Sequence, residues 1–73
     1  MGMKLVIKAR FNASRESFEK FSDGMYLAYL PYPEDDDSVQ VLATLLSRKL
    51  GAVPSRIEYA GKDVKGNWVF ELV

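Results

Sequence analysis

The sequence predicts an α/β domain of the α+β type, in which a four-stranded mixed sheet and one main helix form two layers. Two observations predict this class. Segments of alternating apolar and polar residues near both ends of the chain are typical of strands with one buried face. A stripe of apolar residues spaced three and four apart in the middle is typical of a helix. The resulting order, β-β-α-β-β, provides one helix to cover one face of the sheet.

The first strand is expected over residues 4–11, where the side chains alternate in character. One face carries Leu5, Ile7, Ala9 and Phe11, and the other carries Lys4, Val6, Lys8 and Arg10. Residues 12–21 fit either a short helical turn or an extended return leg. Residues 22–24 predict a turn, because Gly24 can adopt a positive φ. Residues 25–30 are apolar on both faces, which is typical of a central strand.

The helix is predicted from Ser38 to Leu50. Its apolar stripe consists of Val39, Leu42, Leu46 and Leu50, widened by Ala43 and Leu45. Asp37 is expected to cap the first turn, with Gln40 in the second position of a capping box. Gly51 is expected to end the helix in the left-handed conformation. Start signals, stop signals and periodicity therefore agree on this helix.

Two strands are expected after the helix. The first covers residues 56–60, with Ile57 and Tyr59 pointing inward. Residues 61–66 form a polar turn, and residues 67–73 form the final strand. On that strand Trp68, Phe70 and Leu72 share one face.

Length and composition limit the classes of function. The 73 residues make one domain, 1–73. Whether Met1-Gly2 is a cloning scar ahead of a native start at Met3 is left open. The chain has no Cys and no His, which removes disulfides, thiolate metal sites and the usual acid/base group at neutral pH. Ten basic and ten acidic residues cancel. We therefore expect a cytoplasmic protein that is not an enzyme, binds no cofactor and does not enter a membrane.

Several segments resemble the YggU-like family of small uncharacterised proteins. An alternating strand leads into the segment Ala13-Ser14-Arg15-Glu16, followed by an apolar Phe18, a glycine turn and an apolar strand. The proline-rich acidic segment 31–35 then runs into a leucine-rich helix that ends at Leu50-Gly51. The resemblance covers roughly residues 4–72. It implies a mixed α/β sheet and no settled activity.

The sequence departs from this family at its polar motifs. Family members usually carry Gly-Lys-Ala-Asn at the junction of loop and helix, where this chain has residues 36–39, Asp-Asp-Ser-Val. The family's early proline falls on Phe11. Its polar Ser-Arg-x-Lys segment falls on residues 64–67, where only Lys65 keeps the charge. A function that depends on those polar residues does not carry over to this chain.

Two charged segments are candidate sites. The acidic run, Glu34, Asp35, Asp36 and Asp37, could hold Mg²⁺ or Ca²⁺ through carboxylate oxygens, although its spacing is not that of an EF-hand loop. The simpler interpretation is that these anions collect at a helix N-terminus. The basic residues Lys4, Lys8 and Arg10, with Arg15 nearby, could contact RNA or DNA on a sheet face. The simpler interpretation is a solvated strand protected from aggregation.

The face of the sheet away from the helix is the third candidate. One helix covers only one face, and alternation sends half of the apolar second strand to the other face. Soluble monomers seldom leave a large apolar strip bare. The leading hypothesis is therefore a non-enzymatic module that binds a protein partner or a second copy of itself. Nucleic-acid binding, and a metal site or enzyme at residues 34–37, are the alternatives.

Overall fold

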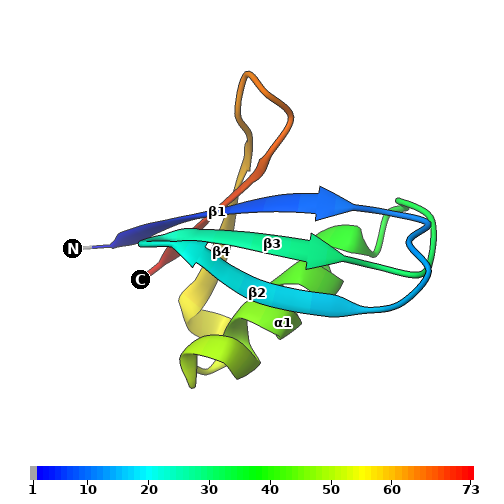
Figure 1. Cartoon of the computed structure of the whole chain (residues 1–73). Helices are drawn as coiled ribbons and strands as arrows, with labels where there is room; N and C mark the ends of the chain where they lie inside the picture. The colour runs from blue at the N-terminus through cyan, green and yellow to red at the C-terminus, as the bar shows by residue number, and fades with distance from the viewer. Residues whose placement is uncertain (1) are drawn as a thin grey trace.

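The computed structural model describes residues 2–73, and the expectation about Met1 lies outside this part of the chain. The fold has two layers, a five-stranded mixed sheet and the helix α1 (Ser38–Leu50) on one face of it (Figure 1). The strands are β1 (Met3–Arg10), β2 (Ser17–Ser22), β3 (Met25–Tyr29), β4 (Ile57–Lys62) and β5 (Trp68–Leu72). A short 3₁₀ turn, Pro54–Arg56, precedes β4. None of the helices in residues 2–73 is long and apolar enough to cross a membrane.

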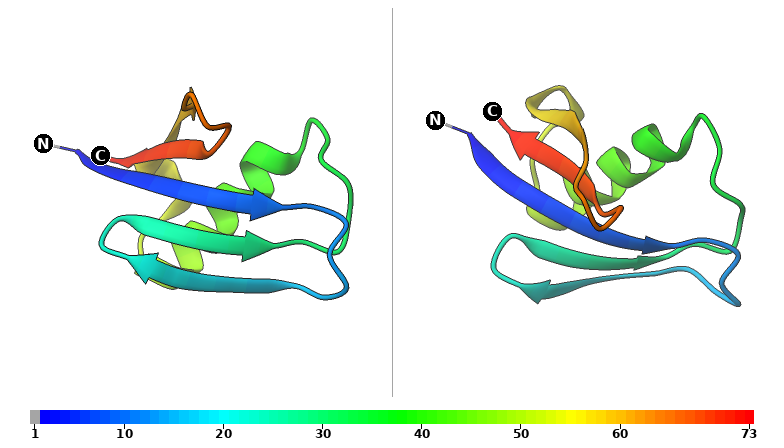
Figure 2. Two further views of the ribbon diagram at one scale, coloured as in Figure 1. Left: turned by 45° about the horizontal axis from the view of Figure 1, so that its top comes forward. Right: turned by 90° about the horizontal axis from the view of Figure 1, so that it is seen from above.

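The sheet order is β2-β3-β1-β5-β4. β1 lies at the centre, parallel to β3 and antiparallel to β5, and Figure 2 shows these strands side by side in two further views. β2 pairs antiparallel with β3, and β4 pairs antiparallel with β5. The mixed sheet and the single helix confirm the predicted class.

The number of strands was predicted wrongly, because residues 17–22, for which a helical turn and an extended leg were both open, form a fifth strand. The three-residue spacing of Phe18 and Phe21 is compatible with a helix, but the backbone of this segment pairs with β3 instead. Phe18 then stacks on Tyr26 with ring centroids 5.4 Å apart and planes 8° from parallel. A bulge between Lys20 and Ser22 leaves Phe21 outside the regular ladder.

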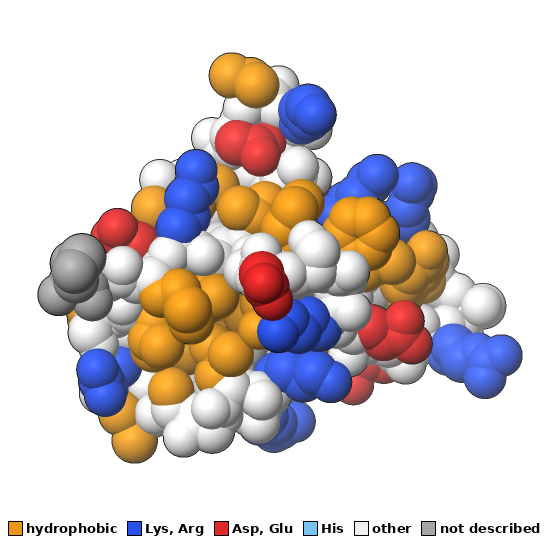
Figure 3. Space-filling view, turned by 60° about the vertical axis from the view of Figure 1, so that its left-hand side comes forward, with side chains coloured by type: hydrophobic (Ala, Val, Ile, Leu, Met, Phe, Trp, Pro, Cys, Tyr) orange, Lys and Arg blue, Asp and Glu red, His pale blue; other side chains and the backbone are white. Residues whose placement is uncertain are grey.

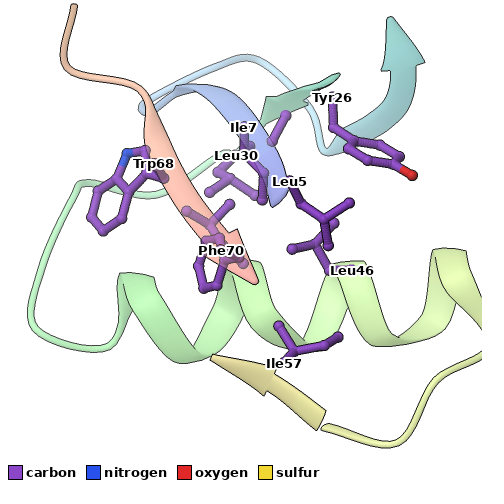
Figure 4. Packing of buried hydrophobic residues seen from close by; sticks show 10 residues of the cluster. Leu5, Ile7, Tyr26, Leu30, Leu46, Ile57, Trp68 and Phe70 are labelled. Carbon is purple, nitrogen blue, oxygen red and sulfur yellow. The ribbon is translucent and has the colours of Figure 1, made fainter. Parts of the chain in front are cut away.

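The core lies between the sheet and α1. β1 contributes Leu5 and Ile7, β5 contributes Trp68 and Phe70, and α1 contributes Leu42 and Leu46. Tyr26, Ala28 and Leu30 belong to the same cluster. Figure 4 shows Leu5, Ile7 and Phe70 between the strands and the helix, on the side of the sheet where Leu46 of α1 lies. The odd positions of β1 and the even positions of β3 and β5 therefore face α1, and the alternate positions face away.

The two ends of α1 differ in how far they follow the sequence prediction. Gly51 ends the helix as expected, with φ 70° and its N–H donating to the Ser47 carbonyl at 2.9 Å. At the start, the Asp37 side chain makes no capping hydrogen bond within the described chain, so the predicted capping box with Gln40 is wrong. Its backbone already has helical angles, φ −88° and ψ −3°, whereas a capping residue is usually extended.

The β4–β5 hairpin bends away from the rest of the sheet. A bulge between Tyr59 and Gly61, with Gly61 at φ 98°, interrupts the ladder and increases its local twist. In Figure 1 the hairpin turn rises on the side of the sheet opposite α1. The turn is held by Asp63, whose carboxylate accepts hydrogen bonds from the backbone N–H groups of Lys65 and Asn67, both at 2.9 Å.

Candidate functional site

Strand alternation decides which side chains occupy the face away from α1. On β1 these are Lys4, Val6, Lys8 and Arg10, and on β3 they are Met25, Leu27 and Tyr29. The parallel register sets them side by side in rows. Arg10 lies beside Tyr29, Lys8 beside Leu27, and Val6 beside Met25. Each cation of this face is thus next to an apolar or aromatic side chain.

A groove of about 410 Å³ lies on this face. Its basic lining residues are Lys8, Arg10 and Lys65, and its apolar ones are Phe21, Met25, Leu27 and Tyr29. Asn67 and Tyr26 complete the lining. Lys65 and Asn67 belong to the turn of the bent hairpin. The raised hairpin therefore forms one wall of the groove, and β1 and β3 form its floor. It is large enough for a small ligand or a short chain segment.

Every charged residue that lines the groove, within residues 2–73, is basic. In the same part of the chain, Lys8, Arg10 and Lys65 form no direct ion pair. The acidic neighbour of Lys65 is Asp63 in the hairpin turn, whose pKa is lowered by hydrogen bonds, the backbone N–H of Asn67 first, and also by the charge of Lys65. Glu19 lies on the same face beside Leu27, but on the outer strand β2 and outside the lining. A chain with zero net charge therefore carries a locally positive groove.

The apolar lining is partly open to solvent. Phe21 is 72% exposed, and Met25 and Tyr29 are 37% and 36% exposed. Phe21 owes its exposure to the bulge in β2 and its position at the sheet edge. In the space-filling view, Lys and Arg side chains lie beside hydrophobic ones below the protruding hairpin (Figure 3). Such a mixed surface suits a ligand that carries both negative charge and apolar or planar groups.

The structure brings together two of the four basic residues singled out in the sequence. Lys8 and Arg10 line the groove, but Lys4 and Arg15 do not. Lys4 lies at the other end of β1 beside Glu71, which in turn lies opposite Glu58 on β4. Lys4 therefore lies in one cross-strand row with two acidic residues, away from the groove.

Sequence reasoning missed the contributions of Lys65, Asn67 and Phe21. Lys65 and Asn67 reach the groove because the hairpin bends, and the only sequence signal of that bend is Gly61 within an alternating segment. Phe21 reaches it through the bulge in β2. The sequence left its segment ambiguous, so its side could not be assigned.

The acidic run does not converge on one point. Among residues 2–73, no three acidic side chains are arranged to hold a metal ion. Asp35 Oδ1 accepts a hydrogen bond from the Asp37 N–H at 2.9 Å, and Glu34 Oε2 pairs with Lys62 Nζ at 3.0 Å. The Lys62 ammonium also lies 4.4 Å from the centroid of the Trp68 ring. These contacts anchor the loop before α1 to the strand β4.

Tyr32 makes a further contact in the loops beyond the ends of β1 and β3. Its hydroxyl donates a hydrogen bond to Glu16 Oε1 at 3.3 Å. Partial burial, followed by the negative charge of Glu16, raises the pKa of the Tyr32 hydroxyl above its usual value. The contact ties the segment before β2 to the segment after β3. It is a structural contact, because the hydroxyl stays protonated near neutral pH.

Comparison of the chain with protein-family models, with curated proteins and with solved structures gives no match.

Proposed function

We propose that this protein is a small non-enzymatic binding module that holds an anionic partner in the groove on the open face of its sheet. One observation carries the proposal. Lys8, Arg10 and Lys65 line one groove without a carboxylate among the described lining residues, in a chain whose net charge is zero. Unpaired cations around an apolar floor favour a partner of opposite charge.

Titration of ¹⁵N-labelled protein with heparin, a general polyanion, tests this proposal. We expect the amide signals of Lys8, Arg10 and Lys65 to shift together. The double substitution Lys8→Gln and Lys65→Gln should remove most of the shift. The matched control is Arg48→Gln with Lys49→Gln, because both cations lie in the last turn of α1, on the other side of the sheet. Equal shifts at the helix end and the groove, or none at the groove, would refute the proposal.

Self-association through the same face is the second candidate, and it continues the hypothesis of a protein partner. The observation in its favour is the exposed apolar surface of Phe21 and Met25. Charge is also unevenly distributed along this face: Lys8 and Arg10 lie at one end, and Glu58 and Glu71 outnumber Lys4 at the other. Two copies packed head to tail would bring opposite charges together. Sedimentation at several concentrations measures this directly.

Family and location are proposals as well. The segments 13–16, 31–35 and 50–51 support membership of the YggU-like family. The cytoplasm is the proposed location, because a chain without Cys gains no disulfide from an oxidising compartment. The lack of His and Cys supports a role in binding rather than catalysis.

A further inference from the structure

We infer that the anionic partner is a single-stranded nucleic acid, with its phosphates against the three groove cations and its bases against Tyr29 and Phe21. This inference rests on the proposed function, since it names the class of ligand that the groove binds. Three classes of partner fit a basic, partly apolar surface, and the exposed rings of this groove favour a nucleic acid. The other two, an acidic protein segment and a second copy of this chain, are outcomes of the test below.

Charge alone does not separate a nucleic acid from an acidic polypeptide, but the exposed rings do. Tyr29 and Phe21 both line the groove, and both are open to solvent. Aromatic side chains on an open sheet face provide stacking surfaces for unpaired bases, and this stacking tolerates any base. The carboxylates of an acidic peptide would neutralise the same cations, but they would not stack on these rings, whereas every nucleotide carries a planar base.

The register places the stacking and phosphate-binding groups next to each other. Arg10 lies directly beside Tyr29 across the parallel pair of β1 and β3, and Lys8 lies beside Leu27 one row further. The guanidinium of Arg10 can contact a phosphate while the neighbouring ring takes the attached base. Asn67 lies on the opposite wall, where its amide nitrogen donates a hydrogen bond to Asp63 Oδ2 at 3.2 Å, so its amide oxygen can accept a hydrogen bond from a base edge.

The length of the groove fits a short stretch of one strand. Tyr29 and Met25 mark two ends of its β3 side and are four residues apart, which corresponds to about 13 Å along a strand. Sheet-face binders of this kind stack about two or three bases. We therefore expect a small site, with three phosphates at most in direct contact with cations.

Fluorescence anisotropy with labelled eight-nucleotide oligo-U and oligo-dT is the primary experiment. Three phosphate contacts on a single strand give a slope of about −2 for log K against log salt. Affinity should therefore fall about 20-fold between 50 and 200 mM salt. A blunt DNA duplex should bind more weakly than either single strand at each salt concentration, because its bases are already stacked.

Substitutions separate the two kinds of contact. Lys8→Gln and Lys65→Gln should each make the salt slope shallower by about 0.7, whereas Lys49→Gln should leave it unchanged. Tyr29→Ala should lower the affinity about 5- to 150-fold at every salt concentration without changing the slope. Tyr29→Phe, which keeps the ring, should lose less than Tyr29→Ala. Thermal unfolding of each variant checks that the fold is intact.

Failure of this inference differs from failure of the proposed function. Suppose that heparin or polyglutamate shifts the groove amides but oligonucleotides bind no better than polyglutamate. The groove then binds anions but is not a nucleic-acid site. The same conclusion follows if the Tyr29→Ala variant binds oligonucleotides as tightly as the wild type does. If duplex DNA binds as well as single strands, the claim of single-strand binding is wrong. If sedimentation shows a dimer that oligonucleotides do not dissociate and that shields the groove, the occupant is a second copy. If no polyanion shifts the groove, the proposed function itself is wrong.

Discussion

The start of α1 provides the sharpest test of the structure against the sequence pattern. The sequence pattern assigns the cap to Asp37, but the structure gives the local hydrogen bond to Ser38. Ser38 Oγ accepts a hydrogen bond from the Asp35 N–H at 2.9 Å, and Ser38 is only 3% exposed. We therefore expect Ser38→Ala to destabilise the protein more than Asp37→Ala does.

The expected magnitudes follow from these contacts. Ser38→Ala leaves the partly buried Asp35 N–H without its acceptor, which costs about 1–2 kcal/mol. The higher helix propensity of alanine returns up to about 0.5 kcal/mol, so the net loss should be near 1 kcal/mol. Asp37→Ala removes a favourable charge at the helix N-terminus but no capping hydrogen bond, so its cost should be about 0.3–0.5 kcal/mol.

Urea unfolding followed by circular dichroism measures both values. For a domain of this size, 1 kcal/mol also corresponds to a shift of about 4–8 °C in Tm. Asp36→Ala is the matched control, because it removes one carboxylate from the same loop, and it should resemble Asp37→Ala. If Asp37→Ala costs more than Ser38→Ala and Asp36→Ala costs almost nothing, Asp37 caps the helix in solution and the reasoning here is wrong.

Three further predictions concern the strands and turns. Hydrogen bonds to the Asp63 carboxylate, above all from the backbone N–H of Asn67, lower the pKa of Asp63 below 3.8. The ionised carboxylate therefore stabilises the hairpin turn above pH 3.8, and this stabilisation is lost as the pH falls through the lowered pKa. A midpoint at or above 3.8 in a ¹³C titration of Asp63 would contradict this. Gly24→Ala should lower Tm, because φ is +72° there and a Cβ would lie 3.1 Å from the Lys4 carbonyl oxygen; an unchanged Tm would show that the turn can rearrange. Leu27→Glu should keep the native fold and weaken any self-association seen by sedimentation, whereas Ala28→Glu, at a fully buried position, should unfold the protein. Similar unfolding curves for the two variants would contradict this assignment of faces.

The helix and the long strands could be predicted because their local signals agree. The leucine stripe of α1 and the stop at Gly51 are encoded within one short segment, and the helix bounds Ser38–Leu50 are confirmed. The alternation in β1 likewise separates Leu5 and Ile7 from Lys8 and Arg10, as the structure shows. These features need no knowledge of distant contacts.

The missed features depend on contacts between distant segments. β2 has weak local preferences and becomes a strand because β3 offers an unpaired edge and Tyr26 offers a ring to Phe18. The groove needs β1, β3 and the bent hairpin at once, so no single segment encodes it. Alternation also places Lys4 and Lys8 on one face, so the sequence predicts one basic site for both. In the structure Lys4 lies beside Glu71 and only Lys8 lines the groove.

The central position of β1 has a consequence for the order of folding. Met3 pairs with Leu72, so the pairing of β1 with β5 closes a loop of almost the whole chain. Contacts of such long range form slowly, because the entropy of loop closure must be overcome first. During synthesis, β1 can pair with β3 early, but its other edge stays open until β5 has left the ribosome. Lys4 and Lys8 on that strand therefore protect the nascent chain from pairing with other chains during this interval.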